Sequence, residues 1–454
     1  MVTGASNQRK YNILVFGASG FTGKYVLAEL IKSIPSDGKP PTIAIAGRTK
    51  AKLEDLLVNL SKESEGFSGK VDCFEVDFSS IEDITNVTGL SSVVISCVGP
   101  YQLFGEPIVE ACVLSGTHYV DITGEPRFVE RMFCKYNEAA RSKDIMIVHY
   151  CGFDSVPADL GSLLVRQKLN SLGKAALSME MFISFEPTLA ANAINFTTFQ
   201  SALVAIGAGR PDLSEFKSKL PPCTTYGKGV FCPLVPRENI HTGKYYTLFP
   251  VADPLVVNMS QSIASKYPED KELYFGNRYT SLIPAKPYSF YSFNDGQAAI
   301  VTFISWTFIL LLCQFKAGLY FLHKYPHWAT FGHIQPPSAG GPSQAKIDGS
   351  SFKIEFLAKG VANEKLTEYS TDPSSAEPDC EIKAIFEGPN AGYNFTSKSV
   401  VIAALTILKE KVQEKRMLPK GVMTPSLAFS NTSFWETLSA NPGVSFEIEE
   451  LKSI

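Results

Sequence analysis

The sequence lacks a surplus of charge of either sign. Its 42 Lys and Arg residues almost balance its 45 Asp and Glu residues, and the formal net charge is -3 at pH 7. Proteins that bind nucleic acid through its phosphates usually carry a basic excess, so no nucleic-acid partner is expected. The first residues, from Met1 to Tyr11, are polar and contain no apolar run, so a secretory signal is not expected either.

The sequence also lacks the short motifs of several enzyme classes and metal sites. No G-x-S-x-G, H-E-x-x-H or P-loop sequence occurs, which leaves hydrolase and kinase functions without support. The nine cysteines include no C-x-x-C pair, and the six histidines show no metal-ligand spacing. We therefore expect reduced cysteines, no disulfide framework and no metal site.

The first third of the chain alternates apolar, β-rich runs with helical segments, which is typical of a parallel α/β sheet. Strands are predicted at 11–16, 42–46, 71–76, 93–96, 118–122 and 145–149, with helices at 21–33, 50–60, 108–115 and 128–143. A repeat of about 30 residues per β-α unit predicts a Rossmann fold, which is a doubly wound parallel sheet.

The pattern changes beyond Gly152, and we predict a second domain of the α+β class. A helix at 157–172 and a strand at 177–185 come first, and residues 207–297 are interpreted as an antiparallel sheet with long loops. Paired strands at 351–358 and 380–387 follow a linker at 335–350, and a helix is predicted at 397–415. The predicted division is a dinucleotide-binding domain at 1–160, a second domain at 161–390 and a C-terminal segment at 391–454.

A glycine-rich turn is the strongest local motif. It reads Gly17-Ala18-Ser19-Gly20-Phe21-Thr22-Gly23, directly after the first predicted strand and at the start of the following helix. In this setting the three glycines allow a tight turn, close approach of a pyrophosphate, and close packing of helix and strand. The helix N-terminus offers free N–H groups to phosphates. We predict a dinucleotide cofactor here; a turn used only for packing is the alternative.

The end of the second predicted strand indicates which cofactor binds. NAD sites place an acidic residue there to bond the ribose 2′-hydroxyl, but this chain has Ala46-Gly47-Arg48-Thr49-Lys50. Because Arg48 can pair with a 2′-phosphate, NADP is favoured over NAD; a solvated basic face is the alternative. Asp77, after the third strand, is expected either to contact the adenine or to cap the next segment. Val98 and Gly99 are expected beside the nicotinamide.

Three residues near the expected nicotinamide position are candidates for the general acid of a reduction. Tyr101 follows the fourth strand, Asp121 lies at the end of the fifth and Asp154 follows the sixth, so all three are expected at the carboxyl edge of the predicted sheet. For each residue taken singly, a capping or turn role is the alternative.

One long apolar segment interrupts the soluble composition. No charged residue occurs from Ala298 to Phe315, and the apolar stretch continues after Lys316 to Leu322. As a helix, the first part would be about 27 Å long, slightly short of the ~30 Å hydrocarbon core of a bilayer. A buried core helix, a re-entrant hairpin and a helix lying in a lipid surface are the three interpretations.

Several motifs together resemble the saccharopine dehydrogenase-like oxidoreductases of animals. They are the turn at 17–23, Ala46-Gly-Arg48, and the segments 98–101, 116–125, 151–161, 388–393 and 421–425, which reach over nearly the whole chain. The same signature is similar to mycobacterial trans-acting enoyl reductases, which act on lipid chains. The resemblance implies a Rossmann domain, an inserted second domain, and a C-terminal segment that packs near the first.

The resemblance also implies residence on lipid droplets or other membranes, facing the cytosol, and favours a lipid-surface role for 298–322. A mitochondrial location is the alternative, and a homodimer is a further expected assembly. Saccharopine itself would need clustered basic residues, whereas Arg210, Arg237 and Arg278 are far apart in a Tyr- and Phe-rich background. We therefore expect an NADP-dependent oxidoreductase acting on a lipid-like carbonyl or conjugated alkene. A catalytically silent lipid-droplet protein and a soluble saccharopine-type dehydrogenase are the alternatives.

Overall fold

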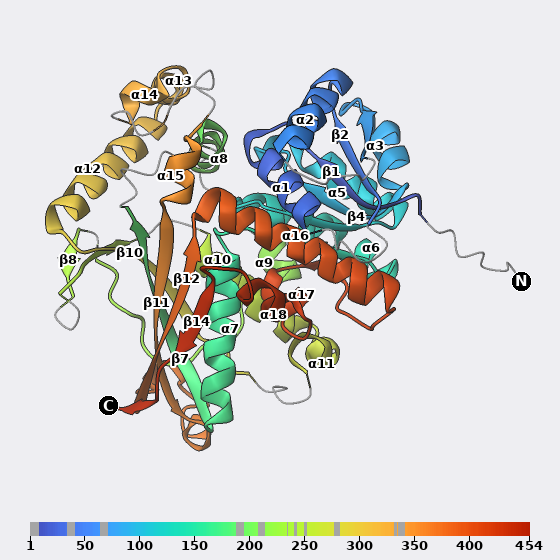
Figure 1. Ribbon diagram of the computed structural model, residues 1–454. Helices are drawn as coiled ribbons and strands as arrows, with labels where there is room; N and C mark the ends of the chain where they lie inside the picture. Colours follow the sequence, from blue (N-terminus) through green and yellow to red (C-terminus); the bar gives the residue numbers. More distant parts are fainter. Residues whose placement is uncertain are drawn as a thin grey trace, which may run out of the picture.

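The computed structural model describes residues 9–33, 41–63, 71–187, 195–207, 214–233, 235–239, 243–248, 252–276, 282–330, 334 and 341–454. Two β-sheets dominate it, and helices cover both (Figure 1). The predicted linker at 335–350 lies partly outside these residues; its described end forms the short helix α15 (Gln344–Asp348).

The first sheet is the predicted Rossmann sheet, and every strand pair in it is parallel. Its order is β13-β6-β5-β4-β1-β2-β3. The strands are β1 (Tyr11–Phe16), β2 (Ile43–Gly47), β3 (Val71–Glu75), β4 (Ser91–Ser96), β5 (His118–Asp121), β6 (Met146–Val148) and β13 (Gly421–Met423). The first six confirm the predicted strands to within two residues at each end. β13 comes from the C-terminal segment.

Both faces of this sheet are buried, as its continuous apolar strands require. On β1, Ile13 and Val15 belong to one core cluster, and Leu14 and Phe16 belong to another. The first cluster includes side chains of α1 (Phe21–Lys32), α2 (Lys50–Glu63) and α16 (Thr396–Thr406). The second includes α3 (Ile81–Thr88), α5 (Glu106–Ser115) and α6 (Pro126–Ser142). Helices therefore cover the sheet on both sides, as in a doubly wound fold.

The second sheet is mixed, with the order β14-β12-β11-β7-β10-β9-β8, and β15 pairs with β12. Its strands are β7 (Lys174–Glu186), β8 (Arg237–Glu238), β9 (Tyr245–Leu248), β10 (Lys286–Phe293), β11 (Ser351–Ala362), β12 (Cys380–Pro389), β14 (Ser445–Ile448) and β15 (Lys452–Ser453). The predicted pairing of 351–358 with 380–387 is confirmed, because β11 and β12 are antiparallel neighbours.

The prediction for residues 207–297 is wrong in part. Two antiparallel strand pairs are present, β8 with β9 and β9 with β10, but β10 runs parallel to β7. The region also contains the helices α10 (Asp253–Lys266), α9 (Ser214–Lys219) and α11 (Lys271–Phe275). α10 was missed because its apolar residues do not form a single stripe; nine of its fourteen residues, polar ones included, are buried.

The two sheets share one core. A single cluster of buried side chains includes Val15 of β1 and Phe352 of β11. The helix α7 (Val156–Ser171) packs on β7, and the C-terminal helix α17 (Pro425–Phe429) packs on α7. The C-terminal segment thus contributes β13 to the first sheet and β14 to the second. The domain boundaries proposed from the sequence stay a prediction.

The long apolar segment forms a bent pair of helices on the outside of the molecule. α12 (Gly296–Cys313) is long and apolar enough to cross a membrane, yet only 17% of it is buried. α13 (Lys316–Lys324) folds back on it, and a Cβ on Gly318 would lie 2.1 Å from the Leu312 carbonyl oxygen, so the turn requires glycine. The interpretation of this segment as a buried core helix is therefore wrong.

Candidate functional site

The glycine turn after β1 is shaped by close backbone contacts. Gly17 has a φ of +78°, and a Cβ there would lie 2.9 Å from the carbonyl carbon of Cys97. A Cβ on Gly23 would lie 2.1 Å from the carbonyl oxygen of Gly17. Only glycine fits these two positions, because a side chain would collide with backbone that cannot move aside. The first and third glycines thus have the predicted roles.

The start of α1 is open to an anion. Ser19 and Gly20 are exposed, Gly20 caps the helix without a side chain, and the first turn contains no acidic residue. Within the described residues, no hydrogen bond engages the N–H groups of Ser19, Phe21 or Thr22. Unengaged N–H groups at the positive end of a helix suit the pyrophosphate of a dinucleotide. The turn therefore fits the cofactor that the sequence predicts.

The side chains in the loops after β2 and β3 differ in whether they form hydrogen bonds or ion pairs with other protein groups. Arg48 is exposed, and no hydrogen bond or ion pair joins its side chain to another described residue. Lys50 is less available, because its ammonium lies 3.8 Å from the Glu54 carboxylate. Asp77 accepts hydrogen bonds from the Ser79 hydroxyl at 2.7 Å and N–H at 2.8 Å, which lower its pKa. This geometry favours Arg48 as the 2′-phosphate ligand and a turn role for Asp77.

The loop after β4 lies against the glycine turn, as predicted for Val98 and Gly99. The Cys97 N–H donates to the Phe16 carbonyl, and Val98 Cγ2 would lie 3.1 Å from a Cβ on Gly17. On its other side the loop meets α8 (Phe196–Gly207): the Ser201 hydroxyl would lie 3.9 Å from a Cβ on Gly99. The structure thus brings a helix of the second region to the loop that is expected beside the nicotinamide, a contact that no sequence motif indicates.

Two of the three candidate acids are engaged inside the protein. The Tyr101 side chain is buried, and its hydroxyl donates to the Ser96 carbonyl at 2.8 Å. Asp121 is fully buried, and its carboxylate accepts hydrogen bonds from four groups, on Tyr119, Thr123, His149 and Tyr150. Neither residue is open to a substrate. The geometry favours the structural alternative for both.

Asp154 differs from them, because the residue is exposed to solvent even though other protein atoms lie close to its carboxylate. Its Oδ2 would lie 2.7 Å from a Cβ on Gly124, and burial among its neighbours raises the pKa of the carboxyl. Asp154 is thus close to the Gly124 backbone and is also open to solvent. A carboxyl with a raised pKa stays protonated at higher pH, which is the property that a proton donor needs. Of the three candidates, Asp154 alone is open to solvent, and its pKa is shifted in the direction that a proton donor needs.

The second sheet and α10 place further polar groups near Asp154 that the sequence analysis missed. Asp253, at the first turn of α10, is 3% exposed and accepts a hydrogen bond from the Ser289 hydroxyl at 3.3 Å. Its burial and, secondly, the charge of Asp154 raise its pKa well above the usual range. Tyr291, on the same face of β10 as Ser289, is also buried and interacts with both carboxylates. No motif marks these residues, since they lie in the segment with the weakest periodicity.

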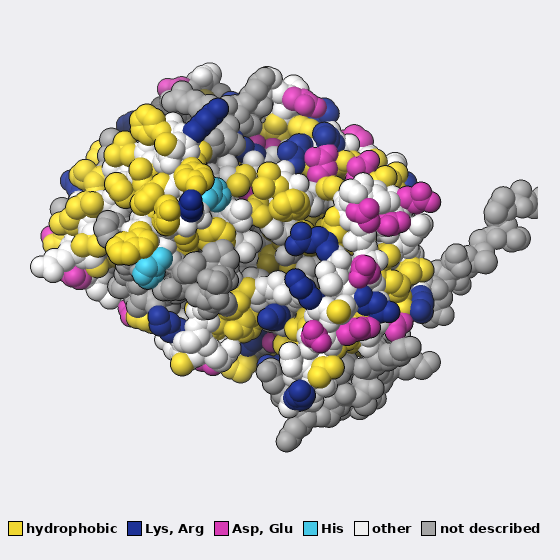
Figure 2. Space-filling view, turned by 90° about the horizontal axis from the view of Figure 1, so that it is seen from above, with side chains coloured by type: hydrophobic (Ala, Val, Ile, Leu, Met, Phe, Trp, Pro, Cys, Tyr) yellow, Lys and Arg dark blue, Asp and Glu magenta, His cyan; other side chains and the backbone are white. Residues whose placement is uncertain are grey.

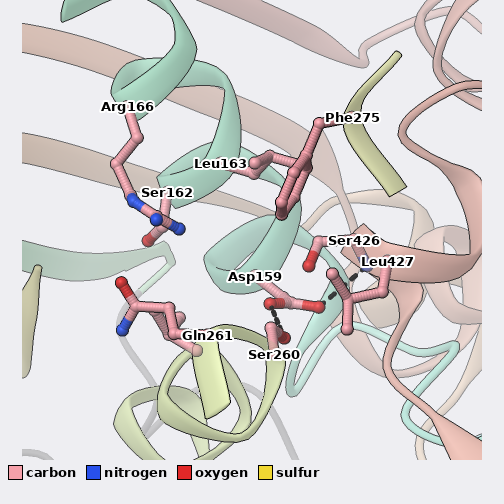
Figure 3. Close-up of a pocket in the computed structure, with 10 residues that line it drawn as sticks. Asp159, Ser162, Leu163, Arg166, Ser260, Gln261, Phe275, Ser426 and Leu427 are labelled. Atoms are coloured by element: carbon pink, nitrogen blue, oxygen red, sulfur yellow. Dashed lines mark hydrogen bonds between the residues drawn. The ribbon is translucent and has the colours of Figure 1, made fainter. Parts of the chain in front are cut away.

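A small pocket lies where α7, α10 and α17 meet (Figure 3). At its edge Asp159 accepts hydrogen bonds from the Ser260 hydroxyl at 2.5 Å and the Ser426 N–H at 2.8 Å. The cavity has a volume of about 10 Å³, which leaves room for roughly one water molecule. It is therefore too small for an organic substrate. The buried Asp159 joins the three helices. No group of three His, Cys, Asp or Glu residues suited to a metal occurs in the described part of the chain.

Comparison with known proteins agrees with this geometry. Residues 13–148 match the family model for the saccharopine dehydrogenase NADP binding domain. The chain is 30% identical to a rat saccharopine dehydrogenase-like oxidoreductase, over 98% of each chain. It is 28% identical to a Caenorhabditis elegans protein called lipid droplet localized protein, over 97% of this chain and 98% of that one. A partial match, 35% identical over 34% of each chain, is to a putative trans-acting enoyl reductase of Mycobacterium tuberculosis.

A solved structure supports the fold. The apo saccharopine dehydrogenase (L-Glu forming) of Saccharomyces cerevisiae superimposes with a TM-score of 0.52 at 12% identity, over 97% of this chain and 100% of that one. The family model assigns NADP as the cofactor, in agreement with Arg48 and the open start of α1. The matched motifs, the parallel sheet and the likeness over almost the full length lead to one conclusion: the chain belongs to the saccharopine dehydrogenase-like oxidoreductase family.

Proposed function

We propose that this protein is an NADP-dependent oxidoreductase that reduces a lipid-like carbonyl or conjugated alkene at the cytosolic face of a lipid droplet or membrane. The observation that carries the proposal is the position of α8. One side of this helix packs against the exposed apolar helices, and Ser201 on it adjoins Gly99 in the nicotinamide-side loop. In Figure 1, α8 lies between α12–α14 and the first sheet.

The exposed apolar side chains of α12, α13 and α14 (Pro326–Ala329) form what we call the apolar surface. They are Ile300, Val301, Ile304, Phe308, Leu311, Phe315, Tyr320, Phe321, Tyr325 and Trp328. Figure 2 shows hydrophobic side chains gathered over this part of the molecule. Isolated exposed apolar residues need no explanation, but a contiguous group of this size favours contact with lipid or protein.

Charge favours lipid over a protein partner. The sequence contains no Asp or Glu from Gly296 to Ile347, whereas Lys316 and Lys324 flank α13. Lys324 lies over the rings of Tyr320 and Tyr325, at 5.2 and 5.6 Å from their centroids. Lysines beside Tyr and Trp are typical of helices that lie at a membrane interface. Because α12 also packs on α8, we propose that it lies in the lipid surface and does not cross it.

The exposed groups of the glycine turn and of Arg48 indicate how the cofactor would bind for the proposed reaction. The glycine turn would hold the pyrophosphate and Arg48 the 2′-phosphate, and bound NADPH would supply a hydride. Asp154 would donate a proton to the substrate atom that gains negative charge, and its carboxylate would then recover a proton from water. The apolar background of the second sheet suits a lipid chain.

Saccharopine chemistry has little support from the basic residues. Arg237 is exposed and lies over the Phe231 ring, and Arg166 donates to the Ile283 carbonyl. Arg210 and Arg278 lie outside the described residues. No described group of arginines is placed to bind several carboxylates. The expected homodimer remains a proposal, tested by the mass of the protein in solution.

The function is tested by tritium transfer from labelled NADPH to a lipid extract. We expect label in a lipid product with the wild type and at least about tenfold less with Asp154→Asn, because the amide cannot supply the proton. No labelled product over a broad panel of lipids would overturn the reaction.

Lipid association is tested separately by flotation with phosphatidylcholine vesicles that contain phosphatidylserine. Leu311→Ser should weaken flotation, and Leu114→Ser, an equally exposed residue of α5, serves as the matched control. Equal flotation of both variants would contradict the assignment of the apolar surface. Recovery of the protein with mitochondria instead of lipid droplets in cells would contradict the proposed location.

A second function is favoured by the engagement of Tyr101 and Asp121 inside the protein. A lipid-droplet protein that keeps the cofactor fold without catalysis would also show this arrangement. Such a protein would bind NADPH and float with vesicles, but it would transfer no tritium. An Asp154→Asn variant that loses a measured activity would exclude it.

A further inference from the structure

The loop after β5 contains a motif whose polar side chains are all buried. Its residues Asp121, Thr123 and Glu125 are at most 2% exposed. All three form hydrogen bonds within the protein, and the two carboxylates have partners on two other loops. A buried carboxylate without partners would be strongly destabilising, so these bonds determine where the loops can lie.

Glu125 holds the loop after β4. Its Oε1 accepts a hydrogen bond from the Tyr101 N–H at 2.9 Å, and its Oε2 accepts one from the Gln102 N–H at 2.8 Å. These are the first two amides of the short helix α4 (Tyr101–Phe104), directly after Gly99 and Pro100. The carboxylate therefore uses both oxygens to fix the end of the nicotinamide-side loop. Bonds of this charge-assisted kind are stronger than those between neutral groups.

Asp121 holds the loop after β6. Its Oδ2 lies 2.7 Å from His149 Nδ1, and its Oδ1 accepts a hydrogen bond from the Tyr150 N–H at 3.1 Å. The Cys151 N–H donates to the Asp121 carbonyl at 2.8 Å. Tyr150 has a φ of +67°, a left-handed conformation that is unfavourable for a bulky residue. Such a conformation persists only where surrounding contacts enforce it.

Thr123 connects the two carboxylates. Its N–H donates to Asp121 Oδ1 at 3.2 Å, and its hydroxyl oxygen accepts the Glu125 N–H at 3.1 Å. The three residues are thus linked in series through the backbone N–H groups of Thr123 and Glu125. On one side they reach the loop that carries Gly99, and on the other they reach the loop that carries Asp154.

We propose that Asp121, Thr123 and Glu125 form a clamp that positions the loops after β4 and β6 for the nicotinamide half of the cofactor. They are positioning residues. The adenine half has its own ligands in the glycine turn and Arg48, so the clamp acts on one end of the cofactor alone. The inference rests on the assigned cofactor site and does not depend on the lipid substrate.

The test compares two ligands on the full-length protein. NADPH binding is measured by its fluorescence, and 2′-phospho-ADP-ribose, which lacks the nicotinamide ring, is measured by calorimetry. Glu125→Gln keeps the shape of the side chain, but its NH₂ group faces a backbone N–H and leaves that donor unpaired. We expect about tenfold weaker NADPH binding and unchanged 2′-phospho-ADP-ribose binding. A general loss of structure would weaken both.

Glu410→Gln is the matched control. Glu410 is 3% exposed and accepts the Ser433 N–H at 2.8 Å, but it lies in the π-helical segment Ile407–Gln413 that continues α16, and its partners belong to neither loop. It should change neither affinity. Thr123→Val provides a milder variant in case Glu125→Gln does not fold; it should weaken NADPH binding about threefold, and Thr123→Ser should restore it.

Each outcome has one meaning for the clamp. Selective loss of NADPH affinity supports it. Equal loss of both ligands in the variants, or no loss of either, overturns it. If the wild type binds 2′-phospho-ADP-ribose and NADPH equally well, the nicotinamide makes no contact, which overturns the clamp and leaves the cofactor assignment intact. Failure of the wild type to bind either ligand overturns the cofactor assignment itself.

Discussion

Two loops at the same edge of the first sheet use their polar groups in opposite ways. The glycine turn after β1 leaves N–H groups unengaged by described residues and exposes Ser19 and Gly20. The loop after β5 buries Asp121, Thr123 and Glu125 and engages each in hydrogen bonds. Polar groups without partners in the protein are suited to bind a ligand. Polar groups that form hydrogen bonds within the protein are suited to position neighbouring loops.

The largest expected effect comes from a substitution that distorts the glycine turn. Gly23→Ala would place a methyl group 2.1 Å from the Gly17 carbonyl oxygen, so the turn must move. We expect at least about a hundredfold loss of NADPH affinity, since the phosphate contacts depend on this backbone. Gly173→Ala is the control: Gly173 has a φ of +72° with nothing near its Cβ, so it should lower stability and leave NADPH binding unchanged. Equal NADPH affinity in both variants would refute the role of the turn.

Removing an engaged group should act on stability first. Asp121→Asn loses acceptor capacity at a fully buried site with four donors. We expect a loss of about 3 kcal/mol in the free energy of unfolding, measured by urea denaturation. A loss below about 0.5 kcal/mol would mean that the hydrogen bonds do not hold the loop.

Arg48 tests the expectation that a side chain without partners in the protein serves binding and contributes little to stability. Arg48→Ala removes an exposed side chain with no described partner, so stability should change by less than about 0.5 kcal/mol. NADPH affinity should fall about tenfold and NADH affinity should not, because only NADPH carries the 2′-phosphate. Parallel loss of both cofactors would contradict the assignment of Arg48.

The smallest effect concerns the buried carboxyl of Asp253. The pKa of Asp253 is raised in the folded protein, so between its unfolded and folded pKa values the folded state binds more protons. Stability should therefore fall as pH rises through this interval. Asp253→Asn should remove that slope and be more stable than the wild type at pH 8, measured by urea denaturation at pH 5 and pH 8. An unchanged slope would assign the pH dependence to other groups.

The sequence predicted the first sheet well and the surroundings of Asp154 poorly, for physical reasons. Strands buried on both faces, such as β1, are continuous apolar runs, and the glycine turn has requirements that few residues satisfy. The role of Asp121 could not be predicted, because its partners Tyr119, Thr123, His149 and Tyr150 are recognised only after the chain folds. Asp253 and Ser201 lie on helices whose periodicity is weak, and their approach to the first sheet depends on contacts between distant parts of the chain.

The direct test of the contrast between the two loops is a crystal structure with bound NADP. We predict the pyrophosphate against the N–H groups of Ser19, Phe21 and Thr22, the 2′-phosphate at Arg48, and the nicotinamide beside Gly99. Asp121 and Glu125 should keep the hydrogen bonds described above, and Asp154 should face the nicotinamide. A structure in which Asp121 or Glu125 leaves its partners and contacts the nicotinamide would contradict the division between binding and positioning loops.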